Sequence, residues 1–259
     1  MIPSTLMARS YRFAFVFAGQ PQMTSQENMR FYEGITKEGM DLPSFEQKKN
    51  IVVLQDRGGN DAPKNVFQIN VGHFQDKFRL FVFEDYPNEP IEIFKKKADS
   101  AWKIMSKIWP KFKDQLVLSE VTLRYTVLAD GDNATVFLLN SCLNIPDEAK
   151  NALGRRIEGI GIRLYDSVLV ALDEDKQPPL SNADFNVAIE TLKEDPSRLY
   201  LQATAKWPSL PLPVARMQQE GIPNFLNPEV RKPSWYLENV EEFIQKQITN
   251  FLLKSKGKE

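Results

Sequence analysis

The segment from residue 88 to residue 110 constrains the fold more than any other part of the sequence. Asn88 and Pro90 open it, and Pro110 closes it. Between them apolar residues recur at steps of three and four, the spacing of one face of an α-helix. They are Ile91, Phe94, Ala98, Ala101, Trp102, Met105, Ile108 and Trp109. A stripe with two tryptophans needs a broad apolar surface to cover it, so the segment predicts a helix lying on a sheet.

Strand-like segments precede this helix. Residues of β-rich composition occur at 11–18, 50–56, 65–71 and 77–84. The connections among the last three are short and rich in turn residues, which favours an antiparallel meander. Thr24 and Glu27 have the spacing of a capping box and predict a helix that runs to about Gly39.

The second half of the sequence repeats this order loosely. Strands are predicted at 115–130, 134–144, 155–166, 167–175, 185–194 and 198–207. A short helix is predicted from Pro146 to Leu153, and a long terminal helix is expected to be capped by Ser234. The elements together predict an α+β protein in which antiparallel sheets are each followed by a long amphipathic helix, as two similar halves. The halves are residues 1–112 and 113–259, and one integrated domain is the alternative.

A proline-rich arm covers residues 207–233. Its six prolines exclude a helix and a central strand. Apolar side chains accompany them, among them Trp207, Leu210, Leu212, Val214 and Phe225. Such residues must be removed from water, so the arm either covers the protein's own sheet or binds a partner.

Composition is that of a soluble globular protein. The chain has 259 residues, of which 42% are hydrophobic and 26% charged, with a net charge of -1. The near-neutral charge supplies no general attraction to nucleic acid or anionic membranes. One cysteine excludes an internal disulfide, and no apolar run reaches the length of a membrane helix, so a cytoplasmic location is expected.

Candidate catalytic residues are few. His73 is the single histidine and falls in a predicted turn, where nothing desolvates it. Cys142 lies in a predicted apolar strand and is interpreted as a small buried hydrophobic residue. The sequence therefore predicts no catalytic residue, no metal site and no cofactor.

A metal-dependent nuclease and a nucleic-acid-binding subunit are the alternatives. For the nuclease, Asp166 and Glu174-Asp175-Lys176 bracket an apolar segment, but extended chain would hold the first two carboxylates about 26 Å apart. For nucleic-acid binding, a basic helix face and a second small cluster could follow phosphates. These residues are Lys95, Lys96, Lys97, Lys103, Lys107, Arg155 and Arg156.

Two segments carry a resemblance. A mid-chain strand holds Leu123-Arg124-Tyr125, and the terminal helix after the proline-containing stretch holds Glu241, Glu242 and Phe251. In these features the sequence resembles a sporadically distributed family of uncharacterised prokaryotic proteins of about 250 residues. The resemblance brings no enzymatic activity. The patchy distribution of the family associates it with mobile defence or toxin–antitoxin genes.

The leading hypothesis is a non-catalytic accessory or regulatory subunit that binds another protein or a second copy of itself. Its support is the surplus of aromatic residues, four tryptophans and seventeen phenylalanines, beside a proline-rich arm. A membrane partner is not expected.

Overall fold

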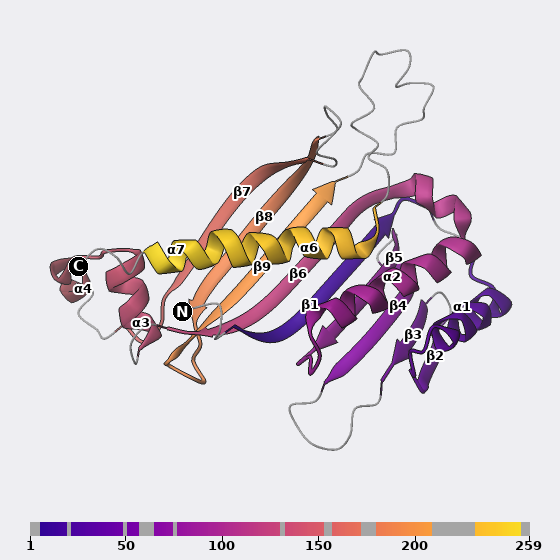
Figure 1. Ribbon diagram of the computed structural model, residues 1–259, viewed down its shortest axis with the longest axis horizontal. Coiled ribbons are helices and arrows are strands. Elements are labelled where there is room, and N and C mark those ends of the chain that lie inside the picture. Colours follow the sequence, from indigo (N-terminus) through magenta and orange to yellow (C-terminus); the bar gives the residue numbers. More distant parts are fainter. Residues whose placement is uncertain are drawn as a thin grey trace, which may run out of the picture.

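Nine strands form one antiparallel sheet in the computed structural model of the protein (Figure 1). The structure describes residues 6–19, 22–48, 51–56, 65–74, 77–129, 133–152, 157–171, 180–208 and 231–254. The strands are β1 (Met7–Phe17), β2 (Ser44–Lys48), β3 (Ile51–Gln55), β4 (Val66–Phe74), β5 (Lys77–Asp85), β6 (Leu116–Leu128), β7 (Gly161–Ala171), β8 (Leu180–Thr191) and β9 (Arg198–Pro208). Their order across the sheet is β2-β3-β4-β5-β1-β6-β9-β8-β7.

The expectation of separate antiparallel sheets, each followed by a long amphipathic helix, is wrong. β1 pairs with β6 from Met7–Thr126 to Phe17–Leu116, and this pairing makes a single sheet of all the strands. The sheet therefore runs without interruption across the boundary expected at residues 112 and 113. The C-terminal helix is also not one long α-helix. It consists of α6 (Pro233–Phe243), a π-helical turn at Ile244–Ile248 and α7 (Thr249–Lys254).

The helical layer lies on one face of the sheet (Figure 1). Besides the C-terminal segment, its helices are α1 (Ser25–Lys37), α2 (Ile91–Ile108) and a 3-10 helix at Pro110–Gln115. The remaining helical elements lie beyond the end of α7, at the left of Figure 1: α3 (Ala134–Phe137), a π-helical turn at Leu138–Cys142 and α4 (Asp147–Ala152). The predicted capping box is present, because the Thr24 hydroxyl accepts a hydrogen bond from Glu27 N and the Glu27 carboxylate accepts one from Thr24 N.

The tryptophan-bearing stripe of α2 is buried as its spacing predicts. Trp102 packs against Phe15 and Phe17 of β1, with ring centroids 4.7 and 6.1 Å away. Trp109 contacts Phe31 of α1 and Phe78 of β5. Because β1 supplies alternate aromatic side chains to this side, its other residues face away from the helices.

The N-terminus of α6 is capped by a different residue from the one predicted. Lys232 is the N-cap and makes no side-chain cap hydrogen bond, so Ser234 lies inside the helix. Its backbone N–H donates to Oδ1 of Asp99 on α2, at 2.9 Å. The carboxylate of Asp99 on the neighbouring helix thus provides the hydrogen-bond acceptor that a local N-cap side chain would normally provide.

Two further predictions fail in the second half. Residues 134–144 begin as α3 and the following π-helical turn instead of a strand, since an apolar run can equally form a buried helix. The strands predicted at 155–166 and 167–175 are replaced by the single strand β7, at Gly161–Ala171. Residues 155 and 156 of the first predicted strand and residues 172–175 of the second lie outside the described residues.

Candidate functional site

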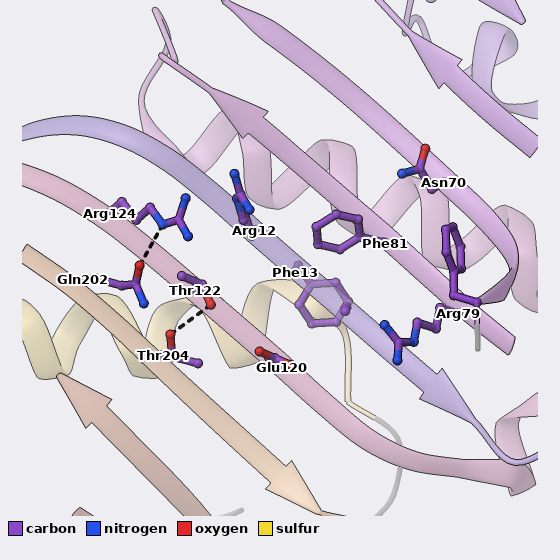
Figure 2. A pocket seen from close by; sticks show the side chains of 12 residues that line it. Arg12, Phe13, Asn70, Arg79, Phe81, Glu120, Thr122, Arg124, Gln202 and Thr204 are labelled. Atoms are coloured by element: carbon purple, nitrogen blue, oxygen red, sulfur yellow. Dashed lines mark hydrogen bonds between the residues drawn. The ribbon is translucent and has the colours of Figure 1, made fainter. Parts of the chain in front are cut away.

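The sheet face opposite the helices carries the candidate site. Alternation along β1 turns Tyr11, Phe13 and Phe15 toward the helices, which leaves Arg12 and Ala14 on the other face. The central strands continue this open face, because Arg12 is paired with Thr122 on β6 and with Phe83 on β5. In the close view α6 lies behind the strands (Figure 2). Arg12, Phe81 and Arg124 on this face are half-buried, so part of each side chain is accessible to solvent.

A hollow of about 500 Å³ opens on this face. Ala14 on β1 is one of its lining residues, and its short side chain leaves room between its paired neighbours Phe81 on β5 and Glu120 on β6. The residues that line the hollow are Arg12, Phe13, Ala14, Asn70, Phe74, Arg79, Phe81, Glu120, Thr122, Arg124, Gln202 and Thr204. They come from five adjacent strands, β4, β5, β1, β6 and β9.

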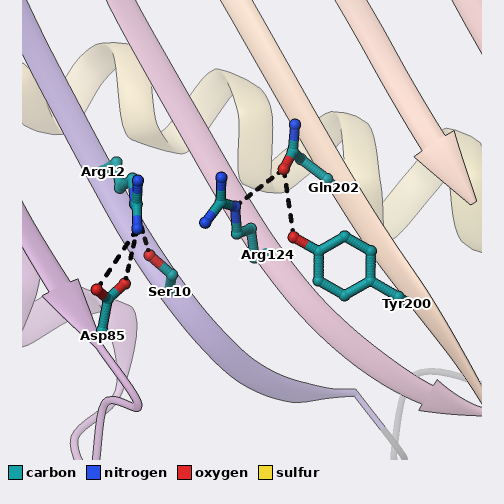
Figure 3. Close-up of polar contacts among 6 residues, drawn as sticks. All are labelled: Ser10, Arg12, Asp85, Arg124, Tyr200 and Gln202. Carbon is teal, nitrogen blue, oxygen red and sulfur yellow. Dashed lines mark hydrogen bonds and ion pairs between the residues drawn. The ribbon is translucent and has the colours of Figure 1, made fainter. Parts of the chain in front are cut away.

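Arg12 is held in place by two neighbours (Figure 3). Its Nε donates to Ser10 Oγ at 3.1 Å, and Nη2 donates to Asp85 Oδ1 at 3.2 Å. The guanidinium carbon of Arg12 also lies over the ring of Phe83, 5.7 Å from the ring centre. The ion pair with Asp85 neutralises Arg12, so this arginine adds little net charge to the hollow.

Arg124 is held differently. Its Nε donates to Gln202 Oε1 at 2.9 Å, and the Tyr200 hydroxyl donates to the same oxygen at 3.2 Å (Figure 3). Burial raises the pKa of Tyr200, so the hydroxyl stays protonated and remains a donor at neutral pH. The two terminal nitrogens of Arg124 have no acceptor among the described residues.

An apolar wall and a polar strip complete the hollow. The rings of Phe81 and Phe83 lie side by side on β5, with centroids 5.2 Å apart, and both are half-buried. On the other side, the hydroxyls of Thr122 and Thr204 are hydrogen-bonded at 3.1 Å (Figure 2). The hollow thus offers aromatic surface, hydroxyl groups and guanidinium groups together.

The partner-binding residues predicted in the proline-rich arm divide into two groups. Trp207 belongs to β9 and is 2% exposed, with its ring 5.0 Å from that of Tyr236 on α6. The structure therefore places it in the core between sheet and helix. Leu210, Leu212, Val214 and Phe225 lie outside the described residues.

The predicted lysine face is largely paired with carboxylates. Lys95 binds Glu241 at 2.7 Å, Lys97 binds Glu89 at 3.0 Å, and Lys103 binds Glu38 at 2.8 Å. Lys96 and Lys107 are exposed. Arg155 and Arg156 lie outside the described residues.

The two residues weighed for catalysis occupy other positions than predicted. His73 lies in β4 rather than in a turn, and its ring contacts that of Phe78 at 5.5 Å. Cys142 ends the π-helical turn rather than lying in a strand, and it is half-buried. Glu174 and Lys176 of the nuclease alternative lie outside the described residues. Within the described residues, no three His, Cys, Asp or Glu side chains are grouped as a metal site would require.

The residues that carry the family resemblance separate onto the two faces of the sheet. Arg124 points into the hollow, whereas Tyr125 is buried on the helix face. Burial, and after it the charges of Tyr11 and Glu241, raises the pKa of Tyr125. Glu241 thus lies near the tyrosine of the strand motif, while Glu242 is exposed and pairs with Lys246.

Local sequence patterns do not identify most of the residues of the hollow. Arg12, Ala14 and Gln202 lie in no recognisable motif, because each is simply a residue on the outer side of an alternating strand. The available signal was this alternation in three segments, 7–17, 116–128 and 198–208. Nothing local indicates that these three strands are neighbours.

Comparisons with known proteins give little further guidance. No family model matches the sequence, and no curated protein matches it. Among solved structures, the crystal structure of the di-domain ARO/CYC StfQ from the steffimycin biosynthetic pathway aligns with 95% of this chain and 96% of its own, at 10% identity and a TM-score of 0.20. At that score the likeness indicates neither a shared fold nor a shared activity. No helix among the described residues is long and apolar enough to cross a membrane.

Proposed function

We propose that the protein is a non-catalytic accessory or regulatory subunit, and that a protein partner docks on the open face of the sheet around the hollow. The observation that carries this proposal is the half-buried pair Phe81 and Phe83 beside Arg12 and Arg124. Aromatic residues and arginine are the side chains enriched where proteins bind one another.

The geometry of this face supports a protein partner. The hollow lies on a broad sheet surface rather than in a deep cleft, and its side chains are already held by hydrogen bonds. Side chains fixed before binding lose little conformational entropy when a partner docks. The resemblance to sporadically distributed prokaryotic proteins supports placing the partnership in a defence or toxin–antitoxin-like system.

Nucleic-acid binding ranks second. Its predicted surface on α2 has Lys95, Lys97 and Lys103 paired with carboxylates. Phosphate binding depends on unneutralised cations that release counterions, so these pairings weaken the case for that surface.

The test is capture of the partner by the tagged protein in its native host, followed by crosslinking and mass spectrometry. Ala14→Leu fills the hollow without changing any charge, and we expect it to abolish capture. Ala188→Leu is the matched control, because Ala188 is paired with Gln202 on the same face but does not line the hollow. We expect both variants to keep the wild-type melting temperature. Undiminished capture by folded Ala14→Leu would contradict the proposal.

A further inference from the structure

We propose that the hollow contains a carboxylate subsite, in which Arg124 receives an aspartate, glutamate or C-terminal carboxylate of the partner. This inference rests on the proposed function, since it specifies the chemistry by which the docked protein is recognised. The residues that act are Arg124 as the ligand-binding group and Gln202 and Tyr200 as positioning groups.

The orientation of Arg124 is the first argument. A guanidinium presents two parallel N–H groups that match the two oxygens of a carboxylate. Gln202 Oε1 takes the Nε hydrogen at 2.9 Å, and the same oxygen accepts from the Tyr200 hydroxyl at 3.2 Å. These bonds fix the plane of the guanidinium and use only its Nε. The terminal nitrogens, which form the fork on the far side, have no acceptor among the described residues.

Charge complementarity is the second argument. Arg12, Arg79 and Arg124 all line the hollow. Asp85 neutralises Arg12, and Glu120 is the acidic residue among the lining side chains. One positive charge is left over, which a single carboxylate would balance. Arg79 strengthens the case, because its Nε is buried and lacks a hydrogen-bond partner among the described residues.

The surroundings favour a carboxylate on a polypeptide. Phe81 borders the hollow with a half-buried ring, so an apolar neighbour of the acidic residue could pack there. The hydroxyls of Thr122 and Thr204 lie on the β6–β9 side and can donate to a carboxylate oxygen or to a main-chain carbonyl. An acidic residue flanked by an aromatic residue therefore fits the hollow on both sides.

The experiment follows the arginine Nε–Hε resonances of the full-length ¹⁵N-labelled protein by NMR. The probe is a blocked tripeptide of glutamate, phenylalanine and glutamate, and the same peptide with glutamine in both acidic places is the control. We expect the acidic peptide to move the Arg124 resonance saturably and the glutamine peptide to leave it in place. The resonance of Arg163 should not move, because this exposed arginine lies on β7 away from the hollow.

Three variants sharpen the test. Arg124→Lys keeps the charge but loses the fork, and we expect it to weaken the peptide about tenfold. Gln202→Ala removes the hydrogen-bond acceptor that orients the Arg124 guanidinium. We expect the affinity for the peptide to fall about threefold, less than for Arg124→Lys. Arg163→Lys should bind as the wild type does.

The outcomes separate this inference from the proposed function. Equal binding of the glutamine peptide, or tighter binding of dimethyl phosphate than of the acidic peptide, would overturn the carboxylate subsite. If Ala14→Leu loses partner capture while Arg124→Lys keeps it, docking on the open face stands and the subsite fails. If Ala14→Leu keeps capture while the acidic peptide still moves Arg124, the subsite stands as an anion site and the docking proposal fails.

Discussion

Lys95 on α2 and Glu241 on α6 form an ion pair, with 2.7 Å between Nζ and Oε2 and side-chain exposures of 9% and 17%. The pair joins the two helices that cover the centre of the sheet. Burial, and after it the charge of Glu241, raises the pKa of Tyr11 on the strand below. A largely buried ion pair therefore connects α2 to α6 within the helical layer.

Removing one partner of this pair should be strongly destabilising. Lys95→Met leaves Glu241 without its counter-ion in a low-dielectric setting, and we expect a loss of about 3 kcal/mol in the free energy of unfolding. The double variant Lys95→Met/Glu241→Leu should lose less than either single variant, since no unpaired charge stays behind. Urea denaturation of the three variants measures this. Single-variant losses as small as that of exposed Lys246→Ala would contradict it.

Trp102 should contribute more than any surface residue of the helical layer. It is 7% exposed and packs on Phe15 and Phe17, so Trp102→Ala should cost about 3–5 kcal/mol through lost burial and an unfilled cavity. Met29→Ala on α1 is the control. Met29 is 48% exposed, and we expect its loss to stay within about 0.5 kcal/mol. Thermal and chemical denaturation should agree on this order.

Glu84 should make stability depend on pH. It is 1% exposed, and burial raises the pKa of its carboxyl despite the hydrogen bond from Asn65 and the nearby Lys97. The folded state then holds the proton to higher pH than the unfolded chain does. The contribution of Glu84 to stability is thus fully present below the unfolded pKa and is lost as pH rises through the folded pKa.

Glu84→Gln removes this dependence. Relative to the wild type, the variant should gain stability as pH rises from about 4 to about 7. Glu38→Gln is the control with the opposite sign, because Lys103 lowers the pKa of Glu38 and its contribution is lost as pH falls. Denaturation at a series of pH values checks both slopes. Parallel slopes for the wild type and Glu84→Gln would rule out the raised pKa.

Asp99 should stabilise the start of α6. Its carboxylate accepts from Ser234 N and lies where a negative charge suits the helix dipole. Asp99→Ala should cost about 1 kcal/mol, and Asp99→Asn should recover most of it because an acceptor oxygen is restored. Hydrogen exchange of the first amides of α6 would localise the effect. Faster exchange spread evenly over the whole protein would argue against capping.

Local patterns explain which elements could be predicted. The strands near 11–18, 65–71 and 77–84 and the helix after Pro90 follow from periodicity, since each has one face to bury. The prediction of a strand at residues 134–144 is wrong because the apolar residues there have no period that distinguishes a helix from a strand. The cap of α6 could not be predicted either, because Asp99 is distant in the sequence and meets the helix only after folding.

The candidate site could not be predicted from local patterns either, because its residues are distant in the sequence and meet only after folding. Arg124 stands out in the sequence only as part of the Leu123-Arg124-Tyr125 element. The residues that hold it, Gln202 and Tyr200, come from a strand more than seventy residues away. Pairing of β1 with β6 decides which side chains meet on the open face. The sequence of either strand alone does not indicate which strand it will pair with.

The central place of β1 also bears on how the chain is made. While the ribosome is still synthesising residues before β6, β1 can pair with β5, but its other edge has no partner. That edge belongs to a strand rich in phenylalanine, which is the kind of template that draws in other chains. Synthesis of the thirty or so residues from the end of β5 to β6 takes seconds at about 5–20 residues per second. We expect this interval to be when the nascent protein depends most on chaperones, and ribosome profiling of chaperone-bound nascent chains would show it as a peak that ends once β6 has emerged.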